Sequence, residues 1–144
     1  MIIFNCTTNI VGGGKKNAVL FIKCSVKYSN YIYLVHESLL EELQDVDIPK
    51  SRLYVFKKSP AKCFSTRRAI EKLVNEISPS VFYTMSGPSY VNVKSLSVCG
   101  ISDGFVTHSS LDSFFNFMPI SLSIKAVLNS VYKLMHLRYN DYLI

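Results

Sequence analysis

The chain of 144 residues has the length of one domain, since globular domains usually span roughly 100–200 residues. Hydrophobic residues make up 49% of it and charged residues only 18%, which excludes intrinsic disorder because disordered chains are poor in apolar side chains and rich in charge. A net charge of +6 favours anionic partners but does not choose among phosphates, nucleic acid and an acidic membrane surface.

The cysteines and the N-terminus indicate the compartment. Cys6, Cys24, Cys63 and Cys99 are widely spaced and form no C-x-x-C pair, so neither a zinc ribbon nor a thioredoxin-type redox site is supported. Scattered cysteines in a domain with an ample core predict reduced thiols. The N-terminus lacks the basic and apolar regions of a signal peptide, and no apolar run approaches the roughly 20 residues of a spanning helix. We expect a cytoplasmic protein, with peripheral contact at the inner face of the membrane left open.

In chain order, apolar runs alternate between strand-like and helix-like spacing. Residues 1–4 predict a first strand, the polar stretch 5–14 a loop, and residues 15–27 a helix, because apolar side chains recur there at helical spacing. Residues 31–35 are aromatic and β-branched, as in a buried strand, and residues 37–43 predict a short helix.

The second half of the chain continues this alternation. Residues 52–56 predict a third strand, and residues 66–78 predict a helix that ends before a proline. Val81–Thr84 and Leu96–Cys99 predict two further strands. Residues 120–138 predict a long amphipathic helix, whose apolar stripe consists of Ile124, Val127, Leu128, Val131, Leu134 and Met135.

Strands that alternate with helices predict an α/β fold: a Rossmann-like open parallel sheet with helices on both faces, in three α/β/α layers. The continuously apolar run at residues 31–35 agrees, because central parallel strands are buried on both sides. Ligands of open α/β sheets bind outside the carboxyl ends of the strands. This rule directs the search for a site to three loops, at residues 5–14, 86–94 and 101–110.

The first loop contains Gly12, Gly13 and Gly14, followed by Lys15. Glycines let a backbone approach a ligand closely, and a helix N-terminus favours an anion. The loop is neither a P-loop nor a dinucleotide fingerprint, because the required glycines and hydroxyl are missing from their positions. The alternative is a tightly packed turn that binds nothing.

The other two loops offer polar side chains. Ser86 and Tyr90 carry hydroxyls on either side of a sharp turn at Gly87, which suits a polar ligand such as a sugar; a simple structured turn is the alternative. Asp103 and His108 are candidates for a catalytic base or for hydrogen bonds to hydroxyls, although an Asp before Gly is often only a turn residue. No H-E-x-x-H motif occurs, so we predict no metal site, and no cofactor is indicated. The G-x-S-x-G motif of a serine nucleophile is absent as well.

Three blocks in this order, NIVGGGK, VFYTMSGPSY and VCGISDG, resemble bacterial GT-B glycosyltransferases of the group 1 type. They are similar to that family's glycine-rich start, to a strand that ends in a Phe-Gly-Pro-x-Tyr-like turn, and to the strand and loop that follow. The resemblance implies two Rossmann-like domains that face each other across a cleft. Residues 1–144 would form only the N-terminal, acceptor-side domain, and the C-terminal donor domain would be absent.

The resemblance also implies an activity: transfer of a sugar from a nucleotide-sugar donor to a cell-envelope glycan or lipid-linked acceptor, with the isolated domain inactive. Gly13 and Gly14 would approach the donor phosphate or the acceptor across the cleft. The first polar group to test for sugar contact would be Asp103. The acceptor side would be lined by Ser86, Gly87 and Tyr90.

Other interpretations stay open. A small non-catalytic Rossmann-like module that binds an anionic ligand needs no second domain. The basic stretch at residues 57–68 fits either a solvated face or contact with anionic phospholipid. Nucleic-acid binding has no RRM, KH or zinc-finger signature to support it. If the apolar stripe of the last helix is uncovered, it predicts self-association, and a separately supplied C-terminal half is a further possible partner.

Overall fold

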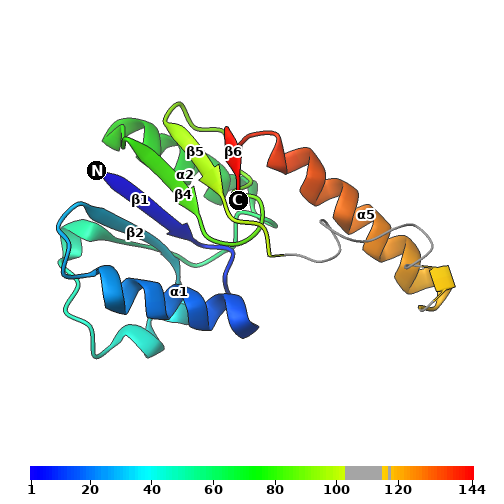
Figure 1. Ribbon diagram of the computed structural model, residues 1–144, viewed down its shortest axis with the longest axis horizontal. Coiled ribbons are helices and arrows are strands. Elements are labelled where there is room, and N and C mark those ends of the chain that lie inside the picture. The colour runs from blue at the N-terminus through cyan, green and yellow to red at the C-terminus, as the bar shows by residue number, and fades with distance from the viewer. Residues whose placement is uncertain (103–114, 117) are drawn as a thin grey trace.

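The structure is a computed structural model and describes residues 1–102, 115–116 and 118–144. These residues form an open sheet of six strands in the order β3-β2-β1-β4-β5-β6, and every neighbouring pair is parallel (Figure 1). The predicted α/β class with a Rossmann-like parallel sheet is therefore confirmed. The strands are β1 (Ile2–Cys6), β2 (Tyr31–His36), β3 (Leu53–Phe56), β4 (Val81–Thr84), β5 (Leu96–Cys99) and β6 (Tyr142–Leu143).

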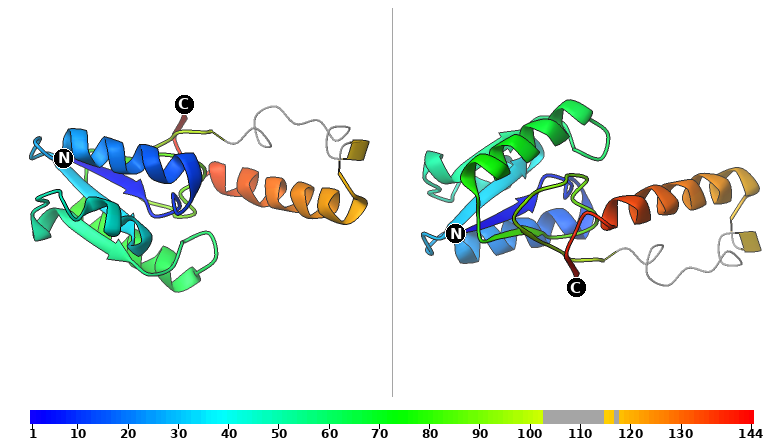
Figure 2. Two further views of the ribbon diagram at one scale, coloured as in Figure 1. Left: turned by 90° about the horizontal axis from the view of Figure 1, so that it is seen from below. Right: turned by 90° about the horizontal axis from the view of Figure 1, so that it is seen from above.

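Helices cover both faces of the sheet, as the sequence predicts (Figure 2). The alternation of side chains along β1 explains why. Phe4 points to one face, where it packs with Ile22 of helix α1 (Gly12–Ser25). Ile3 points to the other face, where it packs with Ile70 of helix α2 (Phe64–Ile77). Each face thus has its own buried apolar cluster, and the sheet is the middle of three layers.

The structure differs from the local predictions in several places, and β1 extends to Cys6 although a loop was predicted from residue 5. Helix α1 begins at Gly12 rather than at residue 15, and Gly12 has a φ of +62°, a conformation that glycine adopts without steric cost. Residues 37–43 form two 3₁₀ turns, η1 (Glu37–Leu39) and η2 (Glu41–Leu43), instead of a helix; the His36 ring accepts the Ser38 N–H and tightens the first turn. Strand β6 has only two residues, too few for a hydrophobic pattern to reveal. A third 3₁₀ turn, η3 (Lys50–Arg52), precedes β3.

The last helix, α5 (Ile120–Leu137), extends beyond the sheet and then returns the chain to β6 (Figure 1). Its buried residues are Ser123, Ser130 and Leu137. The predicted apolar stripe lies on another side of the helix, and five of its six members are exposed: Ile124, Leu128, Val131, Leu134 and Met135. Within the described part of the chain, no helix combines the length and the apolar character that crossing a bilayer requires.

Candidate functional site

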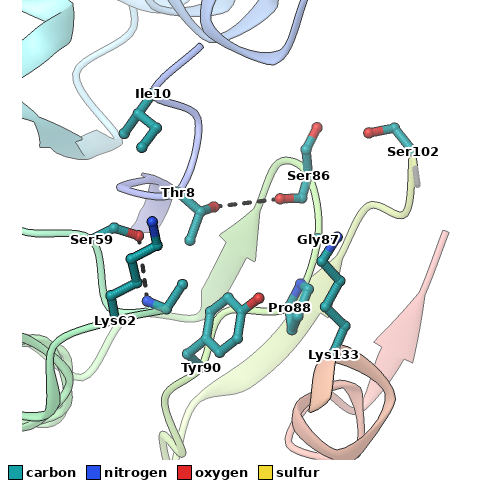
Figure 3. A pocket seen from close by; sticks show the side chains of 11 residues that line it. Thr8, Ile10, Ser59, Lys62, Ser86, Gly87, Pro88, Tyr90, Ser102 and Lys133 are labelled. Atoms are coloured by element: carbon teal, nitrogen blue, oxygen red, sulfur yellow. Dashed lines mark hydrogen bonds between the residues drawn. The ribbon is translucent and has the colours of Figure 1, made fainter. Parts of the chain in front are cut away.

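A pocket of about 520 Å³ lies at the carboxyl edge of the sheet. Loops that follow β1, β3, β4 and β5 form its walls, and α5 contributes one side chain (Figure 3). Open α/β sheets bind ligands at this edge, where the strand order reverses between two neighbouring strands. Here the reversal falls between β1 and β4. The lining residues are Thr8, Ile10, Ser59, Ala61, Lys62, Ser86, Gly87, Pro88, Tyr90, Ser102 and Lys133.

A buried polar layer joins β1 to β4 at the carboxyl ends of these strands. The Asn5 Nδ2 donates to Thr84 Oγ1 at 3.1 Å, across the reversal point of the sheet. The Thr7 Oγ1 donates to Asn5 Oδ1 at 2.7 Å, so the carboxamide is held at both ends. Above this layer, the Thr8 hydroxyl donates to the Ser86 carbonyl at 3.4 Å. These bonds hold together the loops after β1 and β4, which carry Thr8, Ser86 and Tyr90 of the pocket lining.

The turn after β4 is anchored to the end of β5. The Gly87 N–H donates to the Gly100 carbonyl at 2.9 Å, and the Cys99 thiol donates to the Gly87 carbonyl at 2.7 Å. Burial raises the pKa of Cys99 to about 12, so this group stays a thiol and keeps its proton for the bond. Gly87 has a φ of +80°, a left-handed conformation that glycine adopts without steric cost. Hydrogen bonds to the end of β5 therefore stabilise the predicted turn at Gly87.

Tyr90 adopts a left-handed backbone, with φ of 60°, which is strained for an aromatic residue. Its ring stacks on Tyr132 of α5, with centroids 5.7 Å apart, and contacts His136 at 4.9 Å. The Arg67 guanidinium lies over the same ring at 5.5 Å. These contacts hold Tyr90 at the pocket wall despite its conformation. Strain of this kind concentrates at functional sites.

Two lysines bring positive charge to the pocket, and they enter from different sides (Figure 3). Lys62 belongs to the loop between β3 and α2, and Lys133 to α5. Arg67 positions the first of these loops, because its guanidinium donates to the carbonyls of Pro60 and Ala61 and to the Tyr132 hydroxyl. Among the described lining residues there is no carboxylate. The pocket therefore offers five hydroxyls and two ammonium groups, which suit a ligand with hydroxyl and phosphate groups.

The structure brings residues of all three predicted loops to the pocket, but it leaves the glycine-rich end of the first loop outside it. Ser86, Gly87 and Tyr90 line the pocket. By contrast, the lining residues do not include Gly12, Gly13, Gly14 or Lys15.

The three glycines form the first turn of α1, and the Lys15 ammonium makes an ion pair with Glu42 Oε1 at 2.8 Å. Gly12 has a φ of +62°, and a Cβ built on Gly12 or on Gly13 would meet no atom within 4 Å, so the surface of this turn is open. Asp103 and His108 lie outside the described residues.

The sequence analysis did not single out several residues of the pocket. Thr8, Ile10 and Ser102 lie in the loops at residues 5–14 and 101–110, which the strand-end rule marked without singling out these side chains. Lys62 belongs to the basic stretch at residues 57–68, and Lys133 lies on the predicted last helix, far along the chain from the three loops. No described group of three or more His, Cys, Asp or Glu side chains could hold a metal ion.

Outside the pocket, Cys63 has an unusual electrostatic environment. Its side chain lies at the N-terminal end of α2, with Sγ 3.2 Å from the Ser65 hydroxyl. Hydrogen bonds from Ser65 and Thr66 lower the pKa of Cys63 to about 6.

Comparison of the chain with protein-family models, with curated proteins and with solved structures finds no match.

Proposed function

We propose that this chain is the acceptor-side Rossmann-like domain of a GT-B glycosyltransferase. In this proposal the pocket binds a hydroxyl- and phosphate-bearing acceptor, a cell-envelope glycan or its lipid-linked precursor. A second domain supplies the nucleotide sugar. For a lipid-linked acceptor, the reaction takes place at the cytoplasmic face of the membrane.

The observation that carries the proposal is the pocket at the strand-order reversal, with its hydroxyls from four loops and its two lysines. Glycosyl transfer needs an acceptor hydroxyl held in a fixed orientation and a diphosphate whose charge is neutralised. Ser86, Tyr90 and Thr8 are suited to orient a sugar, and Lys62 is suited to an anionic group beside it. The open surface at Gly12 and Gly13 leaves room for an opposing domain to approach the first turn of α1.

A second candidate, a non-catalytic module that binds an anion, is supported by a different aspect of the same pocket. All of its lining residues come from this chain, so it needs no other domain to exist. Such a module would recognise the phosphate group alone. The two candidates differ in whether the sugar contributes to binding.

A titration with three probes separates them. Inorganic phosphate, a hexose 1-phosphate and a nucleotide sugar are added to the isotope-labelled chain, and backbone amide shifts are followed by NMR. The glycosyltransferase proposal expects hexose 1-phosphate to shift the amides of Thr8, Lys62 and Ser86 and to bind more tightly than phosphate. Equal affinity for the two would favour the anion-binding module, and no shift at the pocket would contradict both.

Two variants test the assignment of roles. We expect Lys62→Gln to weaken hexose 1-phosphate binding about tenfold or more, because a hydrogen bond to a charged group is worth roughly 1.5–3 kcal/mol. Lys50→Gln, on an exposed turn away from the pocket, is the matched control and should bind as the original chain does. We also expect no sugar transfer by the isolated chain; turnover at an ordinary enzymatic rate, ~1 s⁻¹ or above, would contradict the need for a second domain.

A further inference from the structure

The outer face of α5 is an apolar stripe that no described part of the protein covers. We call it the α5 stripe. Its members recur at intervals of three or four residues, so they share one side of the helix. All of them are between 48% and 71% exposed: Ile120, Ile124, Leu128, Val131, Leu134 and Met135. A continuous apolar surface of this kind usually marks a site of interaction.

The orientation of α5 is the reverse of that in an ordinary amphipathic helix. Its buried positions are Ser123, Ser130 and Leu137, and the serines are small and polar. An ordinary surface helix turns its largest apolar side chains toward the core. Here they point away from it and are exposed, which makes them available to a partner.

The charges on the helix indicate the kind of partner. Residues 120–138 contain three basic residues, Lys125, Lys133 and Arg138, and no Asp or Glu. Lys125 and Arg138 are exposed. A second copy of the helix would place more cations beside Lys125 and Arg138 and would supply no carboxylate to neutralise them. This charge repulsion disfavours a pair of α5 helices. An anionic lipid surface supplies both an apolar layer and the missing negative charge.

We propose that α5 lies in the plane of an anionic membrane surface. The α5 stripe enters the boundary between headgroups and acyl chains, and Lys125 and Arg138 contact lipid phosphates. The helix, about 27 Å long at 1.5 Å per residue, projects beyond the sheet, so that its length can lie along a flat surface (Figure 2). The α5 stripe shares no residue with the basic stretch at residues 57–68. The proposal does not depend on the proposed enzymatic function.

Vesicle co-sedimentation of the whole chain tests it. Vesicles of phosphatidylcholine alone are compared with vesicles that also contain phosphatidylglycerol. We expect binding to the second kind only, with added salt releasing the protein. Equal binding to both kinds, or binding to neither, would overturn the proposal.

Matched variants assign the surface. Ile124→Ser with Leu128→Ser should reduce the partition constant at least tenfold, because it removes two apolar side chains from the lipid. Leu20→Ser, at a position 62% exposed on α1, is the control for an exposed leucine. Lys125→Gln should reduce binding about fivefold, since each basic residue near an anionic surface contributes roughly 1 kcal/mol, and Lys50→Gln should not.

The remaining outcomes are also decisive. Because the substituted side chains are exposed, the variants should unfold at the same temperature as the original chain. If the chain sediments as a dimer that the Ile124/Leu128 variant dissociates, and it binds no vesicles, the α5 stripe belongs to a second copy and the proposal is wrong. The pocket variant Lys62→Gln should bind vesicles normally, which separates this test from that of the proposed function.

Discussion

Gly100 and Gly13 make a pair in which the same substitution should have opposite effects on stability. Gly100 follows β5, and its N–H donates to the Thr84 carbonyl at 2.9 Å. A Cβ on Gly100 would lie 2.4 Å from the Met85 carbonyl oxygen and 3.3 Å from the Tyr83 hydroxyl. Backbone atoms cannot move aside cheaply, so Gly100→Ala has to displace the hydrogen-bonded strand ends. A Cβ on Gly13 meets nothing within 4 Å.

The expected sizes follow from these distances. Overpacking of a close contact costs about 1–3 kcal/mol, and a clash with backbone belongs at the upper end, so we expect Gly100→Ala to lose about 2–3 kcal/mol. For a chain of this size that corresponds to a fall in Tm of roughly 6–12 °C. Gly13→Ala should gain about 0.4–1 kcal/mol, because alanine restricts the unfolded chain and suits a helix.

Urea denaturation followed by circular dichroism measures both changes. The midpoint should move in opposite directions for the two variants while the slope m stays constant. A Gly100→Ala chain as stable as the original, or a destabilised Gly13→Ala chain, would refute the steric reasoning. Gly13→Ala also tests whether a ligand contacts this turn. Because the variant should be stable, a loss of nucleotide-sugar binding in an enzyme reconstituted with a second domain would come from the space that the new methyl group occupies.

Three further predictions concern the surroundings of the pocket. Arg67→Met should lower the free energy of unfolding in urea titrations by about 2–3 kcal/mol, because two loop carbonyls and the Tyr132 hydroxyl lose a charged donor. Arg67→Lys should recover little of the lost stability, and an unchanged urea midpoint for Arg67→Met would contradict the prediction. The rate at which iodoacetamide alkylates Cys63 should rise with pH, with a midpoint near the thiol's pKa of about 6. This midpoint should move to higher pH in Ser65→Ala, and a midpoint above about 8 in the original chain would contradict the hydrogen-bonded thiolate. Burial and the nearby Arg67 and Arg138 guanidinium groups lower the pKa of His136, so the unfolded chain binds a proton more readily than the folded chain does. The free energy of unfolding should therefore fall as pH drops below about 6.5. His136→Gln should lack this part of the pH dependence, and identical pH profiles for the two chains would contradict the prediction.

The sequence predicted the fold well where a pattern is long. The continuously apolar run at residues 31–35 indicated a strand buried on both faces, and β2 lies between β3 and β1 in a parallel sheet. Short elements were missed or misassigned because they contain too few residues to show a reliable hydrophobic period. The two residues of β6 carry no period, and the 3₁₀ turns of residues 37–43 imitate a helix because Leu39 and Leu43 are four apart and both face the core.

The candidate site was predictable only in part. The strand-end rule marked the loop of Ser86, Gly87 and Tyr90, because it depends only on strand order. Lys133 lies 43 residues beyond Tyr90, and its place in the pocket depends on the path that α5 takes back to the sheet, which no local pattern contains. The left-handed backbone of Tyr90 was equally hidden, since such a conformation normally suggests glycine or asparagine.

The buried bond between Asn5 and Thr84 has a consequence for how the chain acquires its structure. The two residues are 79 positions apart, so the central strand pair cannot form until the chain has been made as far as β4. At ~5–20 residues per second, β4 follows β1 from the ribosome after roughly 4–16 s. During that interval β1 and β2 can already pair, while the other side of β1 is a bare edge with unsatisfied backbone groups. The middle of the sheet is therefore completed late, and nascent chains that stop before Val81 should be prone to aggregate through that edge.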